Sequence, residues 1–415
     1  MPDLFPDSAS VQDGELAVGG IPVSSLAEEF GTPLVVYCRE SLQARARAYR
    51  EAAPGARILY SVKAFPNVAL LRLFADEGLG AEVSALGELE FALRAGIPGD
   101  RIVVDGNNKS DEEIRGAAAA GASFVVDAPD DLARAQAAGI RGDVLVRVTP
   151  GIDAETHDAI RTGHTGSKFG LPPDEALEVI RQGGVTGLHV HIGSQLLDFG
   201  AERMTVEWLA AFAARCRAEA GWTPRLVDLG GGLGIRYLAD DSRLEVRDFV
   251  RALVASTQDA WRLHELPEPE LILEPGRSLV GDAALTVYRV GVVKPLRGTT
   301  YVAVDGGMSD NPRPQLYGAR FTAALAGRFD EPADGSYTVC GKHCESGDVL
   351  IERVALPQPR RGDLLVLPST GAYTLGMASN YNGVPKPAAV LVGDGDARLI
   401  RRRETVEDLL ALESG

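Results

Sequence analysis

Residues 58–84 read ILYSVKAFPNVALLRLFADEGLGAEVS, and this stretch decides the expected fold. Its first part, Ile58–Lys63, is apolar and β-type, and Gly80–Ser84 is a second run of the same kind. Between them, residues 67–78 carry apolar side chains at helical spacing and end on a glycine, which commonly closes a helix. A strand, a helix and a strand at this spacing predict a βαβ unit with two parallel strands.

The same alternation continues to about residue 281. The further β-type runs are Arg101–Asp105, Ser123–Asp127, Asp143–Val148, Gly187–Ile192, Arg225–Leu229 and Glu270–Glu274. Eight strands with helices between them predict an α/β fold, a TIM (β/α)8 barrel over residues 33–281. A doubly wound sheet is the alternative, but it usually has fewer strands and a glycine-rich turn after the first strand, which this sequence lacks.

The pattern changes after residues 274–281, EPGRSLVG. Short β-type runs such as LTVYRVGVVKPL, TYVAVDGG, DVLIERVALP and AAVLVGDG then follow one another, separated by turn residues. This pattern predicts a second, C-terminal domain that is an antiparallel β-barrel. The segment ELAVGGIPV near the N-terminus could add a strand, so we assign residues 1–32 plus 282–415 to this domain.

Composition limits the possible partners. The formal net charge is −16, which argues against nucleic acid and against an anionic membrane surface, because both require a positive face. The first residues, MPDLFPDSAS, show no signal-peptide pattern, and no apolar run is long enough to span a bilayer. The four cysteines are too few for a disulfide scaffold, so we expect a cytoplasmic protein with reduced thiols.

Ionisable residues gather where the predicted barrel strands end, which is where TIM barrels carry their chemistry. Lys63 ends the first strand, Glu82 lies in the second and Asp105 ends the third. Residues 189–194, 228–234 and 274–277 close the sixth, seventh and eighth strands. An isolated Lys63 would be a solvated surface amine. At the mouth of a barrel, burial would instead lower its pKa and free a nucleophile for a Schiff base.

The glycine run LGGGLG follows the seventh strand, where TIM barrels commonly bind phosphate through backbone N–H groups. Ser194, after the sixth strand, offers a hydroxyl donor. An imine-forming lysine with a phosphate cradle implies pyridoxal phosphate as cofactor, and Glu274 would then lie beside the ring nitrogen and keep it protonated. The alternative for Glu274 is an ion pair with Arg277.

The motif HVH also permits a metal interpretation. His189 and His191 stand two residues apart on a strand, so they face the same side, and paired imidazoles bind zinc. Metal-dependent hydrolases on barrels use further His and Asp ligands from later strands, and no other histidine ends a predicted strand here. We therefore place a metal site below the cofactor site and expect none; His191 would stack on the cofactor ring.

Seven motifs together resemble the bacterial diaminopimelate decarboxylases, a family of fold-type III pyridoxal-phosphate enzymes. They are YSVKAF, HVHIGSQ, VDLGGGLGI, EPGR, RPQLYG, CESGD and GAYTLGMASNYNG, and they follow in the order expected over nearly the whole chain. The resemblance implies decarboxylation of meso-2,6-diaminopimelate to L-lysine and CO2, the last step of lysine biosynthesis. It also implies a homodimer with shared active sites, in which CES reaches the site of the partner subunit.

The resemblance implies a role for each matching residue. Lys63 would form the Schiff base, His191 would stack on the ring and Glu274 would pair with its nitrogen, while Cys344 would be the proton donor. The cofactor phosphate would be held by Ser194, Gly231, Gly232, Gly276 and Tyr373, with Arg277 nearby. The distal end of the substrate would be held by Arg277, Arg313, Tyr317, Glu345 and Tyr373.

The substrate chemistry agrees with this assignment, because two arginines and a tyrosine suit a distal carboxylate and Glu345 suits an ammonium. Ornithine decarboxylases of the same group read Cys-Asp at Cys344-Glu345. The chain departs from the family pattern in the stretch from Glu82 to Leu86 and at Gly376. The alternatives are a related decarboxylase acting on ornithine, a D-amino acid or carrier-bound glutamate, a non-catalytic pyridoxal-phosphate-binding protein, and, third, a metal hydrolase.

Overall fold

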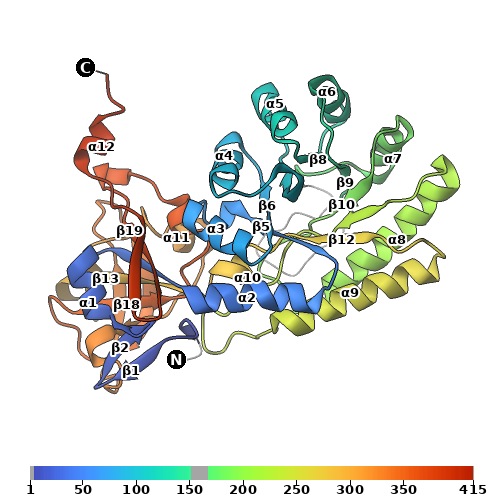
Figure 1. The fold of residues 1–415 in the computed structure, drawn as a ribbon. Coiled ribbons are helices and arrows are strands. Elements are labelled where there is room, and N and C mark those ends of the chain that lie inside the picture. The colour runs from blue at the N-terminus through green and yellow to red at the C-terminus, as the bar shows by residue number, and fades with distance from the viewer. Residues whose placement is uncertain (1–3, 151–166, 415) are drawn as a thin grey trace. The chain divides into compact units, whose positions relative to one another are not determined.

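The computed structural model describes residues 4–150 and 167–414 (Figure 1). The chain forms two compact units. The barrel unit comprises Arg45–Gly234 and Arg243–Ser278, and the sheet unit comprises Met1–Ala44, Ile235–Ser242 and Leu279–Gly415. We predicted domains at residues 33–281 and at residues 1–32 plus 282–415. These bounds remain a prediction. No helix within the described ranges has both the length and the apolar character needed to cross a bilayer.

The barrel unit contains a closed barrel of eight parallel strands. They are β5 (Arg57–Ser61), β6 (Gly80–Val83), β7 (Ile102–Val104), β8 (Ser123–Val126), β9 (Val144–Arg147), β10 (Gly187–His189), β11 (Leu226–Asp228) and β12 (Glu270–Leu273). Each strand pairs with its sequence neighbours, and β12 pairs with β5 to close the ring. Every one of the eight predicted strands is present, and the prediction of a TIM barrel is confirmed.

Helices follow the strands on the outside of this barrel (Figure 1). They are α3 (Val68–Asp76), α4 (Leu86–Arg94), α5 (Asp111–Ala120), α6 (Asp131–Ala138), α7 (Pro173–Arg181), α8 (Gly200–Ala220) and α9 (Val246–Leu263). Local sequence explains several ends. The Asn67 side chain accepts two backbone N–H groups at the start of α3, and Ser110 forms a capping box at the start of α5. Gly121 ends α5 in the left-handed conformation.

Apolar side chains fill the barrel interior. One cluster of buried residues draws on six of the strands and consists of Leu59, Val103, Val125, Leu145, Leu226 and Ile272. The barrel is therefore a packed core and not a pore, as this fold requires. Polar side chains are left for the carboxyl ends of the strands, where the candidate site lies.

The sheet unit is built around a nine-stranded sheet. Its strands are β4 (Leu34–Cys38), β13 (Ala284–Leu296), β14 (Thr299–Val304), β15 (Ala324–Leu325), β16 (Gly335–Cys340), β17 (Val349–Leu356), β18 (Leu364–Pro368), β19 (Ala388–Gly393) and β20 (Asp396–Arg401). Most pairs are antiparallel, as predicted, but β14–β16 and β4–β19 are parallel. The short helices are α1 (Val23–Phe30), α11 (Arg313–Tyr317) and α12 (Val406–Leu410), while α2 (Arg39–Ala52) and α10 (Arg277–Val280) cross the bounds of the units.

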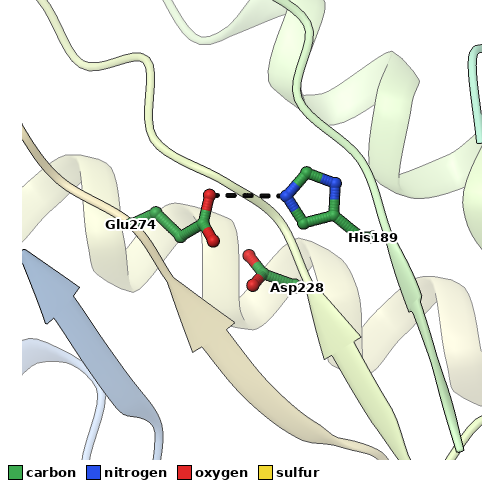
Figure 2. A group of neighbouring side chains, drawn as sticks. All are labelled: His189, Asp228 and Glu274. Carbon is green, nitrogen blue, oxygen red and sulfur yellow. Dashed lines mark hydrogen bonds and ion pairs between the residues drawn. The ribbon is translucent and has the colours of Figure 1, made fainter. Parts of the chain in front are cut away.

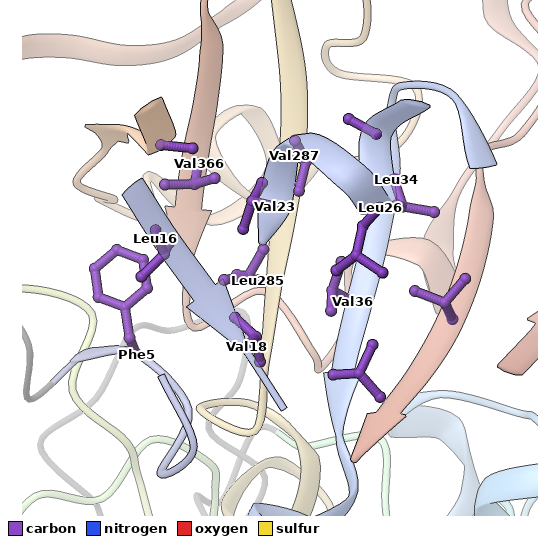
Figure 3. Packing of buried hydrophobic residues seen from close by; sticks show 14 of the residues in the cluster. Phe5, Leu16, Val18, Val23, Leu26, Leu34, Val36, Leu285, Val287 and Val366 are labelled. Carbon is purple, nitrogen blue, oxygen red and sulfur yellow. The ribbon is translucent and has the colours of Figure 1, made fainter. Parts of the chain in front are cut away.

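The N-terminal segment differs from expectation in two ways. ELAVGGIPV does not join the large sheet but forms β2 (Glu15–Val18) and β3 (Ile21–Pro22), which pair in a separate three-stranded sheet with β1 (Ser10–Gln12). The strand that does join the large sheet is β4, which the sequence pattern had placed with the barrel; it lies between β13 and β19. Figure 3 shows how Leu16, Val23, Leu34, Leu285 and Val366 pack in one buried cluster, so both ends of the chain share this core.

Candidate active site

Lys63 lies in a short 3-10 turn (Val62–Ala64) directly after β5, at the carboxyl end of the barrel. Its Nζ atom is 3.1 Å from Oε2 of Glu82, which is buried at the end of β6. The Ser61 hydroxyl donates to the same oxygen at 2.6 Å. The Lys63 side chain is 44% exposed, so the burial expected for its amine is not found in the chain alone. The amine is instead oriented by an ion pair with a buried carboxylate.

A second carboxyl group stands behind this pair. Glu88, in the first turn of α4, accepts the Ser84 backbone N–H at 2.7 Å. Burial, together with the nearby charge of Glu82, raises the pKa of Glu88 to about 7. Ser84 also donates its hydroxyl to Glu82 Oε1 at 3.0 Å. Glu82 is thus fixed from both sides, and it can hold the Lys63 ammonium in one place.

Three buried side chains from neighbouring strands meet in the barrel: His189 on β10, Asp228 on β11 and Glu274 directly after β12 (Figure 2). His189 Nε2 is 3.4 Å from Glu274 Oε2. Burial alone would lower the pKa of His189, but the charge of Glu274 outweighs it and raises the pKa to about 9. Burial likewise opposes ionisation of Glu274, yet the imidazolium lowers its pKa. Glu274 is therefore an anion paired with a cationic His189.

Asp228 has the opposite electrostatic state. Burial, followed by the charge of Glu274, raises the pKa of Asp228 well above its usual value. Its Oδ1 accepts the Gly230 N–H at 2.8 Å. Neither Oδ2 of Asp228 nor Oε1 of Glu274 receives a hydrogen bond from a described residue, although both atoms are buried. Glu274 thus retains acceptor capacity for a ligand, which is what a carboxylate facing a ring nitrogen requires.

This trio also bears on the metal interpretation. One ligand atom from each of His189, Asp228 and Glu274 lies within 4.8 Å of the others, and this is the one such group within the described ranges. The pairing differs from that expected for HVH, because His189 meets the two carboxyl groups without His191. The predicted alternative for Glu274, an ion pair with Arg277, is wrong, since Glu274 pairs with His189.

His191 is half-buried next to the glycine run. Burial, and then the positive charges of Lys63 and Arg147, lower its pKa to about 3, so the imidazole is neutral. Gly230 packs closely against the His191 side chain, since a Cβ on Gly230 would lie 2.8 Å from His191 Nδ1. A neutral, flat ring held close to the Lys63 amine is suited to stacking on an aromatic cofactor.

The glycine run, residues 230–234, forms a turn after β11 in which a side chain at any of the four glycines would meet close neighbours. A Cβ on Gly231 would lie 2.4 Å from the carbonyl oxygen of Glu274, and Gly232 has φ +138°. The loop after β10 fixes this turn, because Leu196 donates to Gly232 O at 3.0 Å. The Gly231 and Gly232 N–H groups have no acceptor among the described residues. Bare amides in a close-fitting turn fit a phosphate group.

Two predicted residues with different roles come together beside this turn. Arg277 is buried, and its guanidinium donates to the Ser194 hydroxyl at 3.0 and 3.3 Å. Ser194 was expected at the cofactor phosphate and Arg277 mainly at the substrate. The structure brings them into direct contact, so both are positioned for an anion at the glycine turn.

Sequence reasoning missed a buried ion-pair network under Lys63. Arg147, at the end of β9, is 2.8 Å from Asp105 and 3.7 Å from Asp127. Burial opposes ionisation of Asp105, but Arg147 lowers the pKa of this carboxyl. A charged residue that ends an otherwise apolar strand, as Arg147 does in VLVR, is the signal that identified Lys63 and could have identified Arg147.

Gly276 is buried in the barrel unit, between β12 and α10, and the remaining predicted residues belong to the sheet unit. The Arg313 guanidinium lies 5.3 Å from the Tyr237 ring centre and 5.6 Å from that of Tyr317, both within cation–π distance. Cys344 and Glu345 are exposed in the loop between β16 and β17. Tyr373 has a positive φ of 57°. The structure therefore brings Arg313 to Tyr317, and Cys344 stands next to Glu345 in the chain.

Asp348 was not predicted, yet it anchors the Cys344 loop. Its Oδ1 accepts the Met308 N–H at 2.7 Å, and its Oδ2 accepts the His343 N–H at 2.9 Å. Asn382 Oδ1 accepts the Cys344 N–H at 3.0 Å. The loop is thus held on both sides of the exposed thiol, which sets the thiol's position within the sheet unit.

Comparison with known proteins agrees with this geometry. Residues 39–281 match the family model described as "Pyridoxal-dependent decarboxylase, pyridoxal binding domain", which defines the class of protein. The chain is 40% identical to the diaminopimelate decarboxylase of Bacillus subtilis over 99% of this chain and 98% of that protein. It is 42% identical to that of Actinosynnema pretiosum, over 99% and 95% respectively. The chain belongs to the diaminopimelate decarboxylases, and the predicted resemblance is confirmed.

Solved structures show the same relationship. The diaminopimelate decarboxylase of M. jannaschii has a TM-score of 0.92 at 33% identity, covering 99% of this chain and 98% of that one. The same protein has been solved in co-complex with L-lysine, with equal similarity to this chain. A lysine/ornithine decarboxylase from Vibrio vulnificus, 24% identical with a TM-score of 0.77, shares the fold.

Proposed function

We propose that this protein decarboxylates meso-2,6-diaminopimelate to L-lysine and CO2. The observation that carries the proposal is the 40% identity to a diaminopimelate decarboxylase over 99% of the chain. The L-lysine bound by the M. jannaschii relative is the product expected of this reaction. The chain would thus act in amino-acid biosynthesis, at the step that forms lysine.

Pyridoxal 5'-phosphate is the cofactor that the barrel residues fit. When bound, it supplies an aldehyde that condenses with amines and a ring that withdraws electrons from the substrate. Lys63 provides the amine, and its ion pair with Glu82 at 3.1 Å orients that amine before binding. Glu274 would hold the proton on the ring nitrogen, because His189 keeps this carboxylate anionic. Neutral His191 would stack on the ring face.

The phosphate group is held at the glycine turn. The N–H groups of Gly231, Gly232 and Gly276 and the Ser194 hydroxyl would donate to it, together with Tyr373. Arg277 contacts the Ser194 oxygen at 3.0 Å and adds positive charge there. These interactions fix the cofactor, so that its reactive carbon stays next to Lys63.

The remaining residues bind the substrate and move the proton. Arg313 grips the distal carboxylate, with Tyr317, Tyr373 and Arg277, and Glu345 holds the distal ammonium. The bond between the D-centre α-carbon and its carboxylate breaks, and CO2 leaves. The Cys344 thiol then donates a proton to that carbon as general acid. The Cys344 thiol is exposed, and Asp348 anchors the loop that carries it, which supports this role.

We further propose that the active form is a cytoplasmic homodimer in which Cys344 and Glu345 of one copy serve the barrel of the other. Mixing a Lys63→Ala variant with a Cys344→Ala variant tests this arrangement. Hybrid dimers would contain one intact site and recover part of the activity. Hybrids that form, by mass spectrometry, and stay inactive would contradict the shared site.

The reaction itself is tested by incubating the purified protein with meso-diaminopimelate and measuring lysine and CO2. Arg313→Ala should reduce turnover of diaminopimelate far more than any slow reaction with lysine or ornithine, since only diaminopimelate has a distal carboxylate. Equal losses on all substrates would contradict this role. The substrate panel should include D-amino acids, and metal analysis of the active protein checks the His189 trio.

A further inference from the structure

A buried carboxyl group faces the glycine turn and has no role in the reaction described above. Glu202, in the first turn of α8, is 3% exposed. A Cβ on Gly232 would lie 2.9 Å from Glu202 Oε1 and 3.0 Å from Leu196 Cδ1. The carboxyl is thus packed directly against the backbone proposed to hold the phosphate.

No positive charge from the described residues shifts the pKa of Glu202. Among the described residues, no hydrogen bond or ion pair to its carboxyl is found, and Asp198 is the charge that acts on its pKa. The loop before α8 contributes Asp198 and the neutral His191, and the glycine turn, residues 230–234, carries no charged side chain. Next to Asp198, Phe199 packs on Phe249 of α9. The cation beside the turn, Arg277, binds Ser194 instead.

A carboxyl in such a place resists ionisation. Burial, and then the negative charge of Asp198, raise the pKa of Glu202 to about 8. Near neutral pH the group is uncharged and carries one O–H donor. A dianionic phosphate at the turn would repel an ionised Glu202 but not a neutral one, and it would raise this pKa further.

We propose that Glu202 must be protonated for the glycine turn to bind the cofactor's phosphate, so that this carboxyl makes cofactor affinity depend on pH. The inference rests on the proposed function, in which the turn holds that phosphate. Glu202 would then determine the pH range in which the cofactor binds, and it is distinct from the residues that carry out the reaction. Loss of one proton from Glu202 would weaken the binding of the phosphate group specifically.

The test compares two ligands of the full-length, cofactor-free protein: pyridoxal phosphate and pyridoxal, which lacks the phosphate. Both form the same bond with Lys63, so the ratio of their dissociation constants isolates the phosphate. With a pKa of about 8, raising the pH from 7.0 to 9.5 should reduce the phosphate's contribution to affinity by about 30-fold. The phosphate ester has its second pKa near 6 and is essentially dianionic throughout this range.

Glu202→Gln keeps the shape and cannot ionise, so its ratio should change less than about twofold over the same range. Glu207→Gln is the matched control: it lies on the same helix, is exposed, and should behave as the wild type. Glu202→Met provides a second non-ionising variant if the Gln variant folds poorly. Near-UV circular dichroism of each variant reports folding.

The outcomes separate this inference from the proposed function. A wild-type ratio that does not change with pH, or a Glu202→Gln ratio that changes as much as the wild type, would overturn the role of Glu202. A protein that binds neither ligand at either pH would contradict the proposed function itself. Binding is measured by equilibrium dialysis, so no outcome depends on catalytic activity.

Discussion

Replacing His189 by glutamine should remove a pH-dependent part of the barrel's stability. The imidazole is fully buried, and its Nε2 is 3.4 Å from Glu274. Burial opposes the charge, but Glu274 raises the pKa to about 9, from a usual value near 6.5. The difference corresponds to about 3 kcal/mol in favour of the folded state when the imidazole is protonated.

The sign of the pH dependence follows from this raised pKa. A group whose pKa is higher in the folded state contributes its full stabilisation below the unfolded value, here pH 6.5. The contribution is lost as the pH rises through the folded value, about 9. Glutamine can hydrogen-bond Glu274 but cannot become a cation. The variant should therefore be less stable than the wild type at pH 6 and close to it at pH 9.5.

Thermal unfolding of the cofactor-free protein, followed by circular dichroism, measures the effect. For a unit of this size, about 3 kcal/mol lowers the melting temperature by roughly 6–12 °C. The difference between wild type and His189→Gln should have this size at pH 6 and shrink to a few degrees at pH 9.5. His264→Gln, at the end of α9, is the control and should show no such trend. An equal difference at both pH values would mean that His189 stabilises by packing alone.

Three further variants test the rest of the barrel site. Lys63→Ala should abolish the yellow imine absorbance of the purified protein, and a protein-linked imine that persists would remove Lys63 from its role. Gly231→Ala would place a Cβ 2.4 Å from a backbone carbonyl, so cofactor affinity should fall more than about tenfold; Gly87→Ala, where nothing lies within 4 Å, should leave it unchanged. Arg147→Met leaves two buried carboxyl groups unpaired and should cost about 3–5 kcal/mol near pH 7, measured by thermal unfolding. This cost should shrink below pH 4, because Arg147 lowers the pKa of Asp105 and that stabilisation disappears once the carboxylate is protonated; a cost independent of pH would contradict the ion pair.

Much of the barrel could be predicted because strand and helix patterns are local properties of sequence. All eight barrel strands were found, with ends that differ by one to three residues, since the last residues of a predicted strand often begin the following loop. Strand β4 shows where this reasoning stops. Its five residues are all buried and apolar, as in a parallel barrel strand. Its partners β13 and β19 lie more than 200 residues away in the chain, and only that pairing assigns it to the other sheet.

For the candidate site, too, the sequence identified the residues but not the contacts between them. Lys63, Glu274 and the glycine run stand at strand ends and carry unusual residue types for those positions, so the sequence identified them. Their environment is a property of the assembled barrel: the ion pair of Lys63 with Glu82 joins β5 and β6, and that of Glu274 with His189 joins β12 and β10. No spacing within a single segment predicts such pairs.

The burial of Glu202 could not be predicted from the sequence, because its residue type is usual for its position. A glutamate in the first turn of a helix is ordinary, since it complements the helix dipole and normally faces water. The approach of Gly232, on a different strand-end loop, helps to bury this carboxyl, and no hydrogen bond or ion pair joins it to another described residue. Burying an unpaired carboxyl costs free energy, and protonation reduces that cost near neutral pH. The glycine turn must accept a phosphate group, which is already negative. Loss of the Glu202 proton would place a further negative charge next to that phosphate and weaken its binding.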